Sequence, residues 1–147
     1  ASFAIGALMG SIVLGVIGHK IYPGRAMIFF VIVWHLLLML FVFVDQLMIG
    51  MVLMVVAGLA QSFSLVPLDG LLMRTSDPAF RGRVMGVRML AIYTLPVSLM
   101  AVGWLIDYIG FQQIMTFYMV MGIVFTLIIA QRWRGSIFRK DAAANVI

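Results

Sequence analysis

The chain has 147 residues, of which 65% are hydrophobic and only 10% are charged, with ten Lys and Arg against five Asp and Glu. A soluble domain of this length does not need so much apolar surface, so the composition excludes an ordinary soluble protein. The sequence contains no cysteine, which excludes disulfides, thiolate metal sites and a cysteine nucleophile. The basic residues cluster in the connections between apolar runs and leave no aromatic-rich basic surface, so nucleic acid is not an expected partner.

Long apolar runs predict transmembrane helices. Each run is close to the roughly 20 residues that a helix needs to cross about 30 Å of hydrocarbon. The alternating pattern of a barrel strand is not seen, and only helices otherwise satisfy the backbone within lipid. The predicted fold class is therefore an all-α membrane protein, with a helical bundle over residues 1–135 and a C-terminal tail over 136–147. The predicted spans are residues 1–18, 26–44, 47–68, 85–106 and 114–131.

The basic residues orient these spans. All ten follow the first, third or fifth run, whereas the connections around Asp45 and over 107–113 hold neither Lys nor Arg. By the positive-inside rule the basic connections and the tail face the cytoplasm, and Asp45 and Ala1 lie outside. The basic residues are Lys20, Arg25, Arg74, Arg81, Arg83, Arg88, Arg132, Arg134, Arg139 and Lys140.

The first run is predicted to be a mature span and not a signal peptide, because its positive charges follow it. The chain starts inside this span with Ala1. We therefore expect it to be a fragment, or one product, of a longer protein.

The predicted topology can be tested by labelling single cysteines. In the intact parent protein, cysteine at position 46 or 112 should react with an impermeant thiol reagent added from outside. Cysteine at position 75 or 136 should not react, because the positive-inside rule places both in the cytoplasm. The reverse pattern would contradict the orientation.

The first span carries small residues at helical spacing. Gly6 and Gly10 lie four residues apart, and Ala7, Ser11 and Gly15 form the neighbouring stripe. Small residues let two backbones approach closely, which stabilises helix pairs in lipid. The residues expected to serve helix packing along the whole chain are Gly6, Gly10, Gly15, Gly58, Ser62 and Gly103.

The second span is bulky throughout and nearly free of small residues, so we expect it at the periphery, facing lipid. Its His35 is a titratable group at mid-membrane depth and therefore a candidate for proton relay. The favoured interpretation is a neutral histidine hydrogen-bonded to a neighbouring helix. The fifth span, with few polar groups, is also expected at the periphery.

The third and fourth spans hold polar and helix-breaking residues, which persist at membrane depth only where protein or a water-filled cavity satisfies them. We expect these spans to line a cavity, although interhelical hydrogen bonds worth about 0.6–2 kcal/mol would explain the same residues. Pro67 and Pro96 each remove a backbone donor and are candidate hinges. The candidate substrate contacts are Gln61, Ser64, Tyr93, Thr94 and Ser98.

Charged residues between the third and fourth spans form the expected inner mouth. Arg83, Arg88 and Asp69 are candidates for a salt-bridge gate, and Arg81 is assigned to topology alone. For Arg83 and Arg88 a purely topological role stays open, because exposed ion pairs contribute only about 0–1 kcal/mol.

No motif for catalysis or for a cofactor is found. Met48, Met51 and Met54 stack at helical spacing, and thioethers bind Cu(I). Flexible packing, or an adaptable surface for varied apolar ligands, explains these methionines better than a metal does. We predict no metal, no cofactor and no enzymatic activity.

A faint internal repeat relates the end of the first span to the end of the fourth. LGVIGHKIYPGRAMI aligns with VGWLIDYIGFQQIM, which matches Gly15 with Gly103 and His19 with Asp107. The two copies end on opposite sides of the membrane, as in the inverted repeats of secondary transporters.

Two segments resemble the C-terminal half of a major facilitator superfamily transporter. DPAFRGRVMGVRMLAIYTLPVSLMAVGWLIDYIG, residues 77–110, is similar to the cytoplasmic loop and eleventh helix of bacterial drug and siderophore exporters. GVIGHKIYPGR, residues 15–25, resembles the family's Gly-x3-Asp-Arg loop, but His19 replaces the acidic residue and Pro23 adds a position.

The resemblance implies helices eight to twelve of a transporter in a bacterial inner membrane, working by alternating access. It implies export of an amphipathic small molecule, an absent N-terminal half as partner, and a coupling carboxylate in that half if protons drive transport. A membrane-embedded enzyme acting on lipid and a non-transporting scaffold are the alternatives. The enzyme would need facing carboxylates or a histidine pair at membrane depth.

Overall fold

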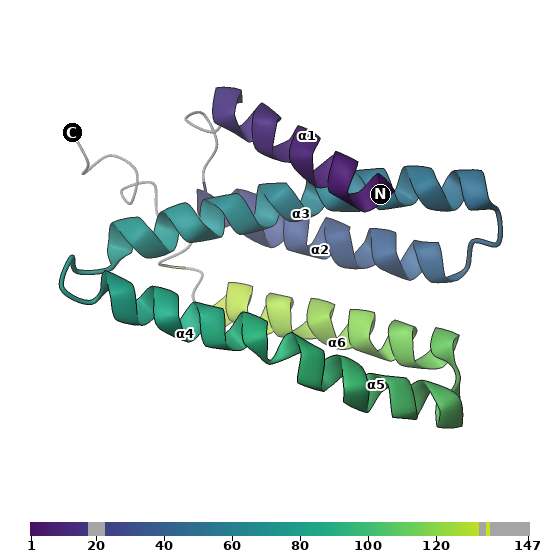
Figure 1. Ribbon diagram of the computed structural model, residues 1–147. Helices are drawn as coiled ribbons and strands as arrows, with labels where there is room; N and C mark the ends of the chain where they lie inside the picture. The colour runs from purple at the N-terminus through teal and green to yellow at the C-terminus, as the bar shows by residue number, and fades with distance from the viewer. Residues whose placement is uncertain (18–22, 133–134, 136–147) are drawn as a thin grey trace.

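The computed structural model describes residues 1–17, 23–132 and 135, and every regular element within them is an α-helix (Figure 1). The all-α class is therefore confirmed for this part of the chain. His19, Lys20, Arg134 and the tail over 136–147 lie outside the described residues. The helices are α1 (Ser2–Ile17), α2 (Pro23–Val42), α3 (Leu47–Thr75), α4 (Arg81–Tyr93), α5 (Leu95–Ile109) and α6 (Phe111–Arg132).

Four helical segments are long and apolar enough to cross a membrane, namely Gly24–Val42, Leu47–Thr75, Arg81–Ile109 and Phe111–Arg132. The first expected span corresponds to α1, an apolar helix of 16 residues. At 1.5 Å per residue α1 is about 24 Å long, whereas the 29 residues of α3 cover about 43 Å and exceed the hydrocarbon thickness. These helices are compatible with an integral membrane protein.

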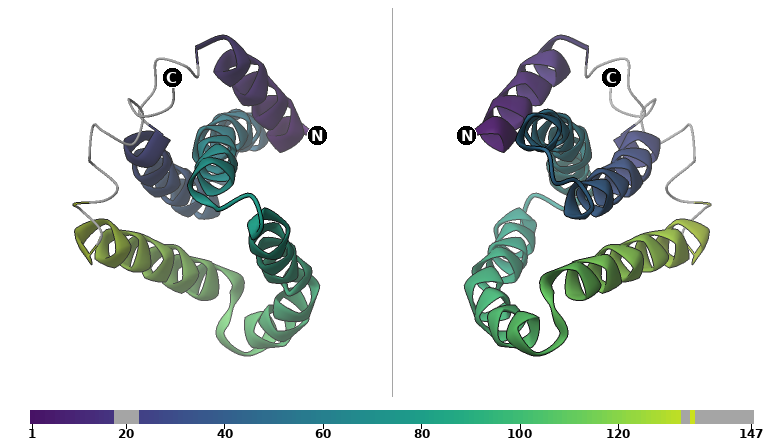
Figure 2. Two further views of the ribbon diagram at one scale, coloured as in Figure 1. Left: turned by 90° about the vertical axis from the view of Figure 1, so that its left-hand side faces the viewer. Right: turned by 90° about the vertical axis from the view of Figure 1, so that its right-hand side faces the viewer.

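Helix α3 is the centre of the structure. Helix α1 crosses it on one side, α2 packs along another, and α6 packs against α2 (Figure 2). This differs from the expectation for the second span, since α2 lies between α3 and α6. Its bulky side chains form packing surfaces, as the Phe30 and Phe63 rings show with centroids 4.7 Å apart.

The expected fourth span comprises two helices, α4 and α5, that meet at a turn at Thr94. The Thr94 N–H still donates to the Leu90 carbonyl, and the Thr94 carbonyl still accepts from the Ser98 N–H. Pro96 is the second residue of α5, a position where the missing N–H of proline has no helical acceptor to lose. Pro67, in contrast, lies inside an uninterrupted α3.

The turn from α5 to α6 uses Gly110 at a φ of 101°, which favours glycine.

Large apolar side chains of α4 and α5 are exposed, including Val97 at 70% and Met100 at 80%. Apolar area of this extent is unfavourable in water and is expected where lipid chains or other transmembrane helices cover it. The core instead lies around α3, with Ala57, Ala60 and Phe63 buried.

Candidate functional site

The α1–α3 crossing brings two backbones into direct contact at glycines. A Cβ on Gly6 would overlap the carbonyl oxygen of Val55, and a Cβ on Gly58 would overlap the carbonyl oxygen of Phe3. A Cβ on Gly10 would lie 2.8 Å from the Cβ of Ser62. No side chain fits at these points, so glycine sets how closely the helices approach.

Hydroxyl groups connect the same two helices. Ser62 Oγ donates a 2.7 Å hydrogen bond to the carbonyl oxygen of Ala7, and Ser11 Oγ donates to that oxygen over 2.9 Å. Ser62 is buried, so the hydrogen bond to Ala7 satisfies a hydroxyl that lipid chains could not hydrogen-bond. The structure thus places Gly6, Gly10, Gly58 and Ser62 in one interface.

Gly15 and Gly103 have no packing partner among the described residues. A Cβ added to either would meet nothing within 4 Å. The expectation that both serve helix packing is not matched in this part of the chain, because the C-terminal end of α1 diverges from α3 (Figure 1) and α5 packs mainly against α6.

Gln61 and Ser64 lie three residues apart on α3, about 60° around the helix from each other. At 100° per residue, Gln61 lies about 160° around the helix from Phe63, which packs on α2. Gln61 is half-buried and Ser64 is 5% exposed. An amide and a hydroxyl are therefore adjacent on α3, the hydroxyl buried within the described bundle and the amide partly exposed.

Tyr93, Thr94 and Ser98 are exposed on α4 and α5 and do not join Gln61 and Ser64. Thr94 Oγ1 donates to the carbonyl oxygen of Ala91 over 2.6 Å, and Ser98 Oγ donates to that of Thr94 over 2.8 Å. Both hydroxyls are thus satisfied within their own helical segment. α5 lies across the structure from α3 (Figure 2).

Asp69 and Arg88 form an ion pair that joins α3 to α4. Arg88 Nη2 lies 2.7 Å from Asp69 Oδ1 and donates a 2.8 Å hydrogen bond to Oδ2. The Arg88 side chain is 23% exposed and that of Asp69 40%. Six residues separate Asp69 from the end of α3, so the pair sits about two turns above the α3–α4 connection.

The other charged residues of this connection make different contacts. The Arg83 guanidinium carbon lies 5.4 Å from the centroid of the Phe80 ring. Arg81 Nε donates to the carbonyl oxygen of Ser76 over 3.3 Å, and Asp77 Oδ1 accepts a hydrogen bond from the Ala79 N–H. Of the three gate candidates, the structure pairs Asp69 with Arg88 and leaves Arg83 outside the pair.

His35 bonds to its own helix and not, as favoured from the sequence, to a neighbouring one. Its Nδ1 lies 2.8 Å from the carbonyl oxygen of Val31, and its ring packs against Gly122 of α6, where a Cβ would overlap it. The imidazole thus replaces the absent side chain of Gly122. Sequence reasoning missed Gly122, because a single glycine in an apolar helix does not identify its partner.

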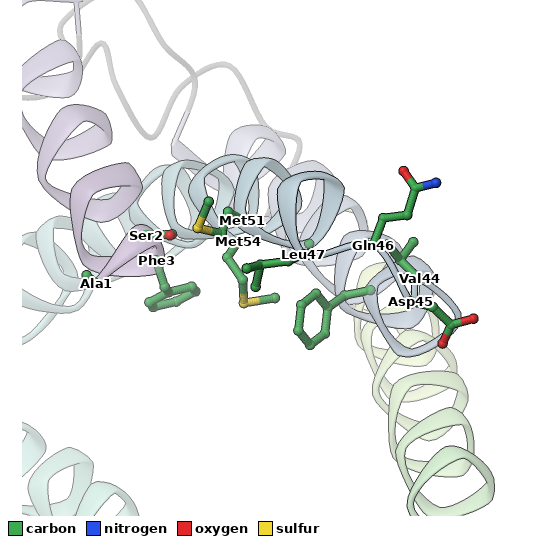
Figure 3. Close-up of a pocket in the computed structure, with 11 residues that line it drawn as sticks. Ala1, Ser2, Phe3, Val44, Asp45, Gln46, Leu47, Met51 and Met54 are labelled. Carbon is green, nitrogen blue, oxygen red and sulfur yellow. The ribbon is translucent and has the colours of Figure 1, made fainter.

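A pocket of about 430 Å³ lies between the start of α1 and the α2–α3 turn (Figure 3). Phe3, Phe41, Met51 and Met54 give it an apolar wall, with Asp45 at its edge. Within the described residues no three His, Cys, Asp or Glu gather in a way that could hold a metal ion. Among the features of the sequence, only the methionine spacing pointed to this pocket, through Met51 and Met54.

No family model, no curated protein and no solved structure matches this chain in the comparisons made.

Proposed function

We propose that the chain forms part of a secondary active transporter of the major facilitator type, moving an amphipathic small molecule by alternating access. Gln61 and Ser64 of α3 are the proposed substrate contacts. A half-buried amide and a buried hydroxyl within a membrane helix are expected to face protein or a water-filled path and not lipid.

The proposed transporter is built from inverted repeats, which the Gly15 and Gly103 alignment supports. In such transporters, interrupted helices lie near the transport path, and these helices can bend at the interruption. The turn at Thr94, between α4 and α5, is the proposed bending point of the apolar segment Arg81–Ile109.

The ion pair between Asp69 and Arg88 carries the proposal. If Leu47 marks the outer boundary of the hydrocarbon, roughly 20 residues of helix bring α3 to the inner boundary near Asp69. A charged pair at that depth joins two helices that otherwise contact little. It is a bond that can break as α4 moves from α3, which is what a gate at the inner mouth requires.

Breaking the pair should impair transport. In cells producing the complete gene product, Asp69→Ala should slow the efflux of a fluorescent amphipathic dye, such as ethidium, by about fivefold, since a half-exposed ion pair is worth about 1 kcal/mol. Asp69→Arg combined with Arg88→Asp should restore much of the rate, because the reversed pair keeps the attraction.

Asp77→Ala is the matched control, since Asp77 is an acid of the same connection and forms no ion pair with a described residue. Its efflux should equal that of the unmodified protein. Efflux that does not depend on a transmembrane ion gradient, or equal loss in the Asp69 and Asp77 variants, would refute the proposal.

A further inference from the structure

The turn between α3 and α4 concentrates positive charge on an exposed surface. Arg74 lies in the last turn of α3, and Arg81 and Arg83 lie in the first turn of α4; all three are exposed. Asp69 neutralises Arg88 through the ion pair, so three arginines face one acid, Asp77, across this turn. The exposed part of the turn therefore carries a net charge of +2, three positive charges minus one.

Two of these arginines are held in position while their outer nitrogens stay accessible. Arg81 uses Nε for its bond to Ser76, and no described residue bonds its Nη groups. Arg83 is placed by the Phe80 ring, with its guanidinium carbon 5.4 Å from the ring centroid. A guanidinium held in this way offers paired N–H donors, which match the oxygens of a phosphate.

The turn joins two segments that are each long and apolar enough to cross a membrane, so a chain that spans the bilayer through both would present this turn at a membrane surface. Phe80 is 51% exposed beside the arginines. An exposed aromatic ring next to arginines is typical of the headgroup level of a bilayer, where the ring reaches the acyl boundary and the cations reach phosphates.

We propose that Arg81 and Arg83, with Arg74 adding to the field, bind the phosphate headgroup of an anionic phospholipid while Phe80 anchors the turn at the acyl boundary. The observations that favour a lipid over a free anion are the exposed ring and the position between two apolar helices. This surface is separate from the Asp69–Arg88 pair, so the inference does not depend on the proposed transport.

The test is a lipid titration of the complete gene product, purified in a neutral detergent. Phosphatidylglycerol should raise its melting temperature saturably, whereas phosphatidylcholine and inorganic phosphate at equal concentrations should not. In Arg81→Gln/Arg83→Gln the half-saturating concentration of phosphatidylglycerol should rise about 25-fold, from about fivefold for each arginine near an anionic surface.

Arg132→Gln is the matched control, because Arg132 is an exposed arginine at the end of α6 and is predicted on the same side of the membrane. It should change the half-saturating concentration less than twofold. If the glutamine variant does not fold, Arg81→Lys/Arg83→Lys takes its place, because it keeps both positive charges. The lysine variant should still bind phosphatidylglycerol more weakly, because it loses the paired N–H donors of the guanidinium groups. An equal loss in Arg132→Gln, equal stabilisation by inorganic phosphate, or no preference for phosphatidylglycerol would overturn the proposal.

Discussion

Replacing Gly58 with leucine should destabilise the helical bundle by about 2–4 kcal/mol, the range expected for overpacking a close contact together with the loss of an interhelical hydrogen bond. The first carbon of the new side chain would overlap the carbonyl oxygen of Phe3 and lie 2.9 Å from the Ala7 nitrogen. Both atoms belong to the backbone, so no rotamer change can relieve the overlap. The helices must separate, which also breaks the bond from Ser62 to Ala7.

The free energy of unfolding is to be measured by titrating mixed micelles with sodium dodecyl sulfate and following helicity by circular dichroism. Gly15→Leu is the matched control, because it makes the same change in the same kind of helix where nothing lies within 4 Å. It should shift the free energy of unfolding by less than about 0.5 kcal/mol. Equal effects of the two substitutions would show that α1 and α3 do not pack at Gly58.

The existence of the helices could be predicted because run length and apolar content alone determine whether a segment can cross a bilayer. Their ends could not. Helix α3 continues to Thr75, seven residues beyond the apolar run, because Asp69 and Arg74 end the hydrophobic pattern but not the backbone hydrogen bonding. The apolar run ends where side chains are expected to leave the hydrocarbon, whereas the helix ends where its backbone hydrogen bonds end.

The two prolines show why local signals were insufficient. Each removes one donor and disfavours helical backbone at the preceding residue. Helix α3 nevertheless continues through Pro67, whereas a turn at Thr94 precedes Pro96. The presence of a proline therefore does not by itself predict where one helix ends and the next begins.

The candidate site was likewise predictable only in part. The small-residue spacing of Gly6 and Gly10 could be read from α1, but their contacts with Val55 and Ser62 require the crossing of α1 and α3. The hydroxyls of Thr94 and Ser98 were predicted to face a substrate, although each can equally bond a carbonyl of the preceding turn, as they do here. Sequence cannot distinguish these uses, because the hydroxyl and its spacing are the same in both.

Gln61→Cys should react with an impermeant thiol reagent from both sides of the membrane. Alternating access opens one site first to one compartment and then to the other, so a residue lining that site is reached from each. The measurement needs no knowledge of the substrate, and the absence of cysteine from the 147 residues keeps labelling within this chain specific. Labelling is to be followed in right-side-out and inside-out vesicles containing the complete gene product.

Ser62→Cys is the matched control, since it changes one atom at the adjacent residue, which is 7% exposed and faces α1. It should be unreactive from either side. Transport by alternating access predicts labelling of Gln61→Cys in both kinds of vesicle and protection of Ser62→Cys in both. Labelling of Gln61→Cys from one side only, or from neither, would contradict it.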